Sequence, residues 1–292
     1  VKKNDYDYVA ISEERLLNKK YPYSFPFLSI NYCMNAFKIK NVSQIDYLIS
    51  DYIREKKWHR SGRSYNVKEF DFFKKKFKFN ENKIIQIPHH LAHAASVYYT
   101  SGFKNSAILI VDGNGSDLET NTFWEGKGRK IKLIDRYVGT GIGSLYHNIT
   151  EYCLSLGQGS EGKTMGLAPY GKKFKQQLNF KGELKGIKTS YSDIITRMPH
   201  NDIFTIKHSV PIKRFNTNLP IRKKNQKVTN QKWSRIAYEL QNETERCLIH
   251  LGKEIQKKIK SKNISIAGGV ALNSVANQKI FEKCSFKNMH VF

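Results

Sequence analysis

The sequence has few cysteines and no long apolar run. Its 292 residues hold four scattered cysteines without a CxxC pair, which argues against a disulfide framework or a zinc ribbon: Cys33, Cys153, Cys247 and Cys284. The longest apolar stretches, such as 107–111, are far below the roughly 20 residues of a membrane-spanning helix. The polar first stretch does not resemble a secretion signal. We therefore expect a cytoplasmic protein without a membrane segment.

Acidic residues are also scarce, with 25 Asp and Glu against 50 Lys and Arg and a formal charge of +25. A surplus of this size attracts nucleic acid, anionic membranes or phosphorylated small molecules. The basic residues recur in short runs along the whole chain, and no zinc finger, basic zipper or RNA-recognition motif accompanies them. The pattern favours a solvated basic surface over a nucleic-acid groove.

Predicted strands and helices alternate along the chain. The strands are expected at 7–11, 45–49, 83–87, 106–111 and 264–267, with a hairpin formed by 121–124 and 130–137. The helices are expected at 27–37, from about His89, at 144–156, at 233–259 and from about Asn273. Residues 172–230 are basic and have no sustained period. This order predicts an α/β fold with ligands at the carboxyl ends of strands.

Two histidines stand four residues apart at the start of a predicted helix. In the segment IPHHLAHAAS, this spacing puts His89 and His93 on one helix face, as in metal-binding helices, and directs His90 elsewhere. An isolated HxxxH pattern is more often explained by helix capping or surface packing.

Asp112 strengthens the metal interpretation. It leaves the apolar strand AILIV and is followed by Gly113, at the end of a strand where α/β sheets place their ligands. Two histidines and one carboxylate suit a redox-capable divalent metal such as Fe²⁺, with Zn²⁺ as an alternative. Taken alone, an Asp-Gly pair is usually a turn.

Three further segments have the small residues of ligand-binding loops. In GSEGKTMGLAPYGK, residues 159–172, we predict a tight loop that presents Glu161 and Lys163 to an anion. A glycine-rich surface loop is the alternative there. In ISIAGGVALNSVANQ, Gly268 and Gly269 lead from a strand into a helix, which suits an adenine ring or a phosphate. A simple packing contact between strand and helix explains that pair equally well.

The segment GTGIGS, residues 139–144, contains Gly141 and Gly143. It is a weaker candidate for a phosphate loop than the other two segments.

Together, HHLAHAASVYY, VDGNG, GSLYHNIT, EGKTMGLAPYG and AGGVALNSVANQKI resemble the NodU/CmcH family of carbamoyltransferases in sequence and order. The resemblance implies an actin-like ATPase superfold with two packed α/β lobes, followed by a YrdC-like domain. On this basis we divide the chain into a first lobe at 1–171, a variable basic region at 172–230 and a second-lobe segment at 231–292.

The resemblance also implies a reaction. The YrdC-like domain would make carbamoyl-adenylate from carbamoyl phosphate and ATP, and this domain would pass the carbamoyl group to a hydroxyl of a small-molecule acceptor. By position, His89, His93 and Asp112 match the metal ligands of the family. Lys20 matches the lysine of its KH pair, although Tyr21 replaces the histidine. The residues that fall in nucleotide and carbamoyl loops are Glu161, Lys163, Gly268, Gly269 and Asn273.

Some family features have no counterpart between Val1 and Phe292. These are the first strand with its GHDA-like loop, a GDxG-like segment with a further metal-ligating Asp, and the YrdC-like domain. We therefore expect a chain cut short at both ends and inactive by itself in the complete reaction. The alternatives are a threonylcarbamoyl transferase acting on tRNA and a non-catalytic nucleotide-binding module. The sequence does not identify the acceptor substrate.

Overall fold

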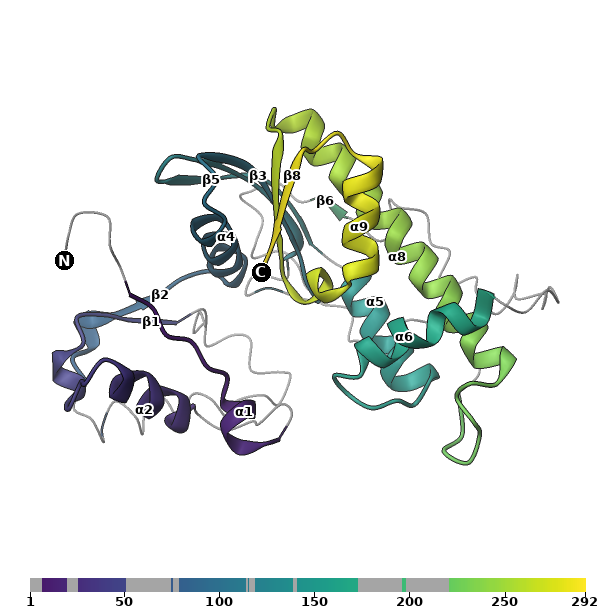
Figure 1. Ribbon diagram of the computed structural model, residues 1–292, viewed down its shortest axis with the longest axis horizontal. Coiled ribbons are helices and arrows are strands. Elements are labelled where there is room, and N and C mark those ends of the chain that lie inside the picture. The colour runs from purple at the N-terminus through teal and green to yellow at the C-terminus, as the bar shows by residue number, and fades with distance from the viewer. Residues whose placement is uncertain are drawn as a thin grey trace. The chain divides into compact units, whose positions relative to one another are not determined.

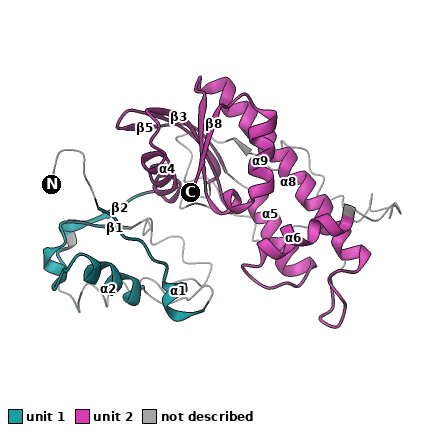
Figure 2. Ribbon diagram, viewed as in Figure 1, with its two compact units in different colours: residues 1–87 teal, residues 88–292 magenta. Residues whose placement is uncertain are grey.

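The computed structural model describes residues 7–19, 26–50, 75, 79–113, 115, 119–138, 141–172, 196–197 and 221–292. The chain forms two compact units, residues 1–87 and residues 88–292 (Figure 2). The lobe boundaries expected at 171 and 231 both fall within the second unit. Lys20 and most of the basic stretch 172–230 lie outside the described residues.

The first unit contains short helices and two paired strands. Its elements are α1 (Glu13–Leu17), α2 (Phe27–Ala36), η1 (Val42–Gln44), β1 (Leu48–Ser50), η3 (Glu81–Lys83) and β2 (Ile84–Gln86). β1 and β2 run parallel, and a small core around Val42 and Phe79 packs under α2. The strand predicted at 7–11 is wrong, because these residues pair with no strand in the described part of the chain.

The second unit is built on one mixed sheet with the strand order β6-β5-β4-β3-β7-β8. The bounds are β3 (Asn105–Val111), β4 (Glu119–Lys127), β5 (Lys130–Val138), β6 (Thr196–Arg197), β7 (Asn263–Ala267) and β8 (Asn288–Val291). β3 pairs antiparallel with β4 and parallel with β7. Segments far apart in the sequence therefore lie side by side in one sheet (Figure 1), and the predicted α/β class is confirmed.

Both faces of β3 are buried, which explains its continuous apolar run. Ile108 and Ile110 pack toward Ala94 and Val97 of α4 (His89–Thr100). The alternate residues of β3 pack toward α8 (Gln231–Lys258). Figure 1 shows α4 and α8 on opposite sides of the sheet. The strand thus ends at Val111 between two covered faces, and Asp112 is the first residue to leave it.

The last part of the chain follows the predicted order of helix, strand and helix. α8 begins after Asn230, whose side chain accepts a hydrogen bond from the Lys232 backbone N–H at 3.1 Å. After β7, a short 3-10 helix, η6 (Gly269–Leu272), leads to α9 (Ser274–Lys283). The predictions for 233–259 and for a helix from about Asn273 are confirmed.

The loop predicted at 159–172 is wrong for most of its length. Residues Glu161–Lys172 form helix α6, in spite of their glycines and Pro169. Leu167 and Ala168 are buried in the same core cluster as Trp233 of α8. This packing supplies the helical stability that the local sequence lacks.

The helix predicted at 144–156 is divided into two parts. The first is α5 (Ile142–Asn148), and a π-helix, η4 (Ile149–Cys153), follows it directly.

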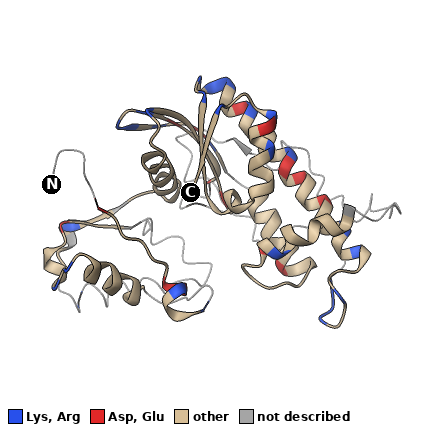
Figure 3. Cartoon of the chain, in the orientation of Figure 1, with Lys and Arg blue, Asp and Glu red and all other residues tan. Residues whose placement is uncertain are grey.

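Charged residues are distributed over both units (Figure 3). On α8 and α9, basic and acidic side chains alternate and pair locally, for example Lys257 with Glu254 and Lys279 with Glu282. In the described residues, no helix combines the length and apolar character needed to cross a membrane.

Candidate functional site

Helix α4 begins at His89, directly after Pro88, and its first two turns carry both predicted metal ligands. Because His89 and His93 are one helical turn apart, their rings lie on the same face. The two Nε2 atoms are 3.1 Å apart. The helix therefore presents two imidazole nitrogens to one point in space.

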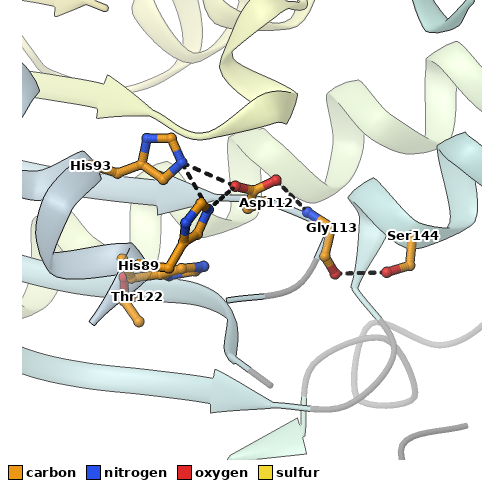
Figure 4. A network of polar contacts seen from close by, with 7 residues as sticks. His89, His93, Asp112, Gly113, Thr122 and Ser144 are labelled. Atoms are coloured by element: carbon orange, nitrogen blue, oxygen red, sulfur yellow. Dashed lines mark hydrogen bonds and ion pairs between the residues drawn. The ribbon is translucent and has the colours of Figure 1, made fainter. Parts of the chain in front are cut away.

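Asp112 reaches this point from the end of β3. Its Oδ2 lies 3.0 Å from Nε2 of His89 and 3.1 Å from Nε2 of His93 (Figure 4). The three ligand atoms lie within 4.8 Å of one another. The structure thus brings together three side chains that the sequence separates.

The chemistry of these atoms fits a bound cation. Burial by itself raises the pKa of Asp112, but hydrogen bonds from His89, His93 and the Gly113 backbone outweigh it and hold the pKa well below its usual range. The carboxylate is therefore ionised at neutral pH. Two imidazole nitrogens and one carboxylate oxygen in mutual contact form a donor set that suits a divalent transition metal.

The loop after β3 is held in place by its own hydrogen bonds. Asp112 Oδ1 accepts from the Gly113 backbone N–H at 2.6 Å, and the Ser144 hydroxyl donates to the Gly113 carbonyl at 2.7 Å (Figure 4). Ser144 belongs to α5, so this contact ties the start of α5 to the carboxylate loop.

His90 faces away from the pair, as predicted. Its Nδ1 lies 2.9 Å from the Thr122 hydroxyl, which also accepts a hydrogen bond from the Trp124 indole N–H at 2.8 Å. Burial lowers the pKa of His90 to about 3. His90 is therefore a neutral histidine packed against β4, next to the two candidate ligands on the same helix.

Glycines at the starts of α5 and η6 approach Asp112. A side-chain carbon at Gly143 would lie 2.7 Å from the Asp112 carbonyl oxygen, and one at Gly269 would lie 3.1 Å from Asp112 Oδ1. Gly268 has a φ of +96° and its missing side chain would strike the Val111 carbonyl oxygen. Gly141 is closed in similarly by Thr120. The four predicted glycines thus gather around the end of β3, where only a bare backbone fits.

The whole chain, residues 1–292, matches the family model described as carbamoyltransferase N-terminus. The chain belongs to this family. The resemblance to carbamoyltransferases drawn from the sequence motifs is confirmed.

Several relatives share this domain. The uncharacterized protein sll1178 of Synechocystis sp. is 27% identical over 330 residues, which cover 97% of this chain and 50% of that protein. Nodulation protein NolNO of Sinorhizobium fredii is 25% identical, over 97% of this chain and 41% of that protein. The crystal structure of T. kodakarensis HypF gives a TM-score of 0.42 at 15% identity, over 91% of this chain and 40% of that one. The chain spans half or less of the length of these proteins.

A second polar cluster of this carbamoyltransferase domain surrounds Glu161, at the first position of α6. Its Oε1 lies 2.7 Å from Nδ1 of His147, and the other ring nitrogen of His147 lies 2.9 Å from the Glu151 carboxylate. The described contacts thus join Glu161 to a histidine of α5. Lys163, two residues further along α6, has an exposed side chain.

Asn273 takes part in a third group of contacts, at the start of α9. It forms a reciprocal amide pair with Gln241 of α8, with contacts of 2.9 and 3.1 Å, and it caps α9 through the Ala276 backbone N–H. The Tyr146 hydroxyl donates to Gln241 at 3.1 Å. The predicted nucleotide-loop residue Asn273 is thus fixed by α8 and α9, directly after η6.

The sequence reasoning did not select Tyr146, His147 or Gln241. Tyr146 and His147 lie within the quoted motif GSLYHNIT, and the four-residue spacing of His147 and Glu151 was an available signal. Gln241 had no such signal, because nothing in the order of residues pairs α8 with the segment after β7.

Proposed function

We propose that this domain binds carbamoyl-adenylate, made from carbamoyl phosphate and ATP, and transfers its carbamoyl group to a hydroxyl of a small-molecule metabolite. Membership of the carbamoyltransferase family supports the transfer chemistry. The observation that carries the proposal is the convergence of His89, His93 and Asp112 beside the Gly268-Gly269 loop. A YrdC-like domain in the rest of the protein would supply the adenylate.

The ligand set defines the metal that we expect. Two imidazoles and one carboxylate leave coordination positions open, so we favour Fe²⁺ over Zn²⁺. When bound, the metal would supply positive charge that polarises a phosphate or carbamoyl oxygen.

The side chains and backbone of the domain would hold the adenylate and the acceptor in position. Gly143 and Gly269 bring bare backbone close to Asp112, a contact that a side chain at either position would prevent. We expect the phosphate of the adenylate to lie against this backbone. Lys163, exposed near the start of α6, offers a cation to such an anion. Holding the adenylate carbonyl near the acceptor hydroxyl converts a two-molecule collision into a reaction within one complex, which by itself accelerates transfer.

The first prediction tests the ligand pair. In the full-length protein, His93→Ala should remove metal and lower AMP release from preformed carbamoyl-adenylate, measured with a panel of hydroxylated acceptors, by about 100-fold or more, since even outer partners of metal ligands cost 10–100-fold. Metal content is read by mass spectrometry of the purified protein. His250→Ala is the matched control, because His250 is exposed on α8.

Undiminished AMP release by the His93→Ala protein would refute the role of the histidine pair. Full metal content in that variant would show that other residues hold the ion.

A further inference from the structure

His147 lies between two carboxylates that come from different elements. Its Nδ1 is 2.7 Å from Glu161 of α6, and its Nε2 is 2.9 Å from Glu151 of the π-helix. The three side chains are partly buried, with exposed fractions of 23% for His147, 28% for Glu151 and 36% for Glu161. Water therefore screens these contacts only in part.

This arrangement determines the protonation state of the ring. A neutral imidazole has one N–H and donates from one nitrogen only, whereas an imidazolium donates from both. Two ionised carboxylates, one on each nitrogen, therefore require the charged ring. The hydrogen bond to Glu161 raises the pKa of His147, against burial, and both carboxylates add to the rise.

Glu161 is also coupled to the group that fixes the segment after β7. Tyr146 is the neighbour of His147 in α5, and burial first, and then the charges of Glu161 and Glu245, raise its pKa. The Tyr146 hydroxyl donates to Gln241, which pairs with Asn273. His147 thus holds the Glu161 carboxylate from the residue next to Tyr146, whose hydrogen bonds lead through Gln241 to Asn273.

We propose that His147 is a positioning residue, which in its charged form clamps the Glu161 carboxylate at the start of α6 by bridging it to Glu151. On losing its proton the ring donates to only one of the two carboxylates, and this bridge is broken. The inference rests on the proposed function, because it assumes that Glu161 lines the carbamoyl-adenylate site. It adds a role for His147, to which the resemblance gave none, and a dependence on pH that comes from this histidine.

The direction of the pH dependence follows from the contacts. The charged groups that act on His147 are Glu161 from α6 and Glu151 from the π-helix, and both favour its protonated form. The clamp is therefore complete at pH values below the ordinary histidine pKa of 6.5, and it is lost as pH rises through the raised pKa of the folded state.

The second prediction is a change in the pH profile. In the full-length protein, His147→Gln should raise the KM for preformed carbamoyl-adenylate, read as AMP release, about tenfold near pH 6.5, as expected for the loss of a hydrogen bond between charged groups. In the wild type, KM should rise as pH increases and His147 loses its proton. Because glutamine does not titrate, this rise should disappear in the variant, and the KM values of the two proteins should converge at high pH. His250→Gln, which removes an exposed histidine of α8, should leave the profile unchanged.

Glu151→Gln provides a milder variant that keeps the contact between His147 and Glu161. It removes one of the two carboxylates that favour the charged ring, so the alkaline rise in KM should move to lower pH. This variant tests the inference even if the His147→Gln protein does not fold.

Parallel pH profiles in the wild type and both variants would overturn the inference and leave the proposed function standing. Absence of AMP release in the wild type with every acceptor of the panel would instead overturn the proposed function, and the inference with it.

Discussion

At the scale of single residues, Asp112 connects the separate parts of the candidate site. One of its carboxylate oxygens faces His89 and His93, and the other accepts from the Gly113 backbone. A side-chain carbon at Gly269 would lie 3.1 Å from that second oxygen. The direction of the carboxylate is therefore set by a backbone N–H on one oxygen and by two imidazoles on the other.

The third prediction concerns Gly268, the residue before Gly269. Gly268→Ala should lower the free energy of unfolding by about 1–3 kcal/mol, because a side chain at positive φ is strained and the new carbon would strike the Val111 carbonyl. Urea unfolding measures the change. In the control, Gly166→Ala on α6 meets no atom within 4 Å and should raise stability by roughly 0.5–1 kcal/mol. Equal effects of the two substitutions would contradict the close approach at Gly268.

The sequence predicted part of the site at this scale. His89, His93 and Asp112 were found because helical spacing and the exit of an apolar strand are local signals, and the structure brings these residues together. His147 was missed because its main partner, Glu161, lies on another helix. A contact between two helices leaves no mark in the spacing of either one.

At the scale of elements, predictions based on local sequence patterns were correct, and those that depend on contacts between distant segments were not. The strand 106–111 and the helix 233–259 were predictable, because a continuous apolar run and a long amphipathic stripe can be recognised from the sequence alone. α6 was predicted as a loop because glycines and a proline lower the local helix propensity. Its burial against α8, which a single segment does not reveal, decides the outcome.

The fourth prediction compares the caps of two helices. Asn230→Ala at the exposed start of α8 should cost about 1 kcal/mol of unfolding free energy, the usual value of a lost cap. Asn273→Ala removes the cap of α9 and also the two amide hydrogen bonds to Gln241. Since Tyr146 and Glu245 still contact Gln241, the added cost should be that of two hydrogen bonds, about 1–3 kcal/mol. Chemical unfolding of the two variants distinguishes these costs. A cost at Asn273 no larger than at Asn230 would contradict the energetic role of the amide pair.

At the scale of the whole molecule, charge is the dominant property. The formal charge of +25 is carried on both units, and acidic partners neutralise part of it along α8 and α9 (Figure 3). This distribution agrees with a solvated basic surface. The alternative of a tRNA-modifying enzyme would instead require the charge to bind a polyanion.

The fifth prediction tests that alternative through salt dependence. We expect only weak retention of tRNA on filters at 50 mM salt, which is abolished at 200 mM and is equal for unrelated RNA of the same length, because it reflects charge alone. The full-length protein is used, with heparin as a competitor. Retention of tRNA that survives 200 mM salt and exceeds that of the unrelated RNA would favour the tRNA-modifying alternative.

The place of β3 between β4 and β7 has a consequence for how the protein is made. The histidines of α4 and the aspartate after β3 leave the ribosome long before β7, whose parallel pairing with β3 brings Gly268 and Gly269 to that aspartate. Until then, the nascent chain has the three candidate ligands without Gly268 and Gly269 beside them. Under the proposed function, an ion that arrives early during translation would meet the three candidate ligands before the glycine segment is in place, and metal loading would precede adenylate binding.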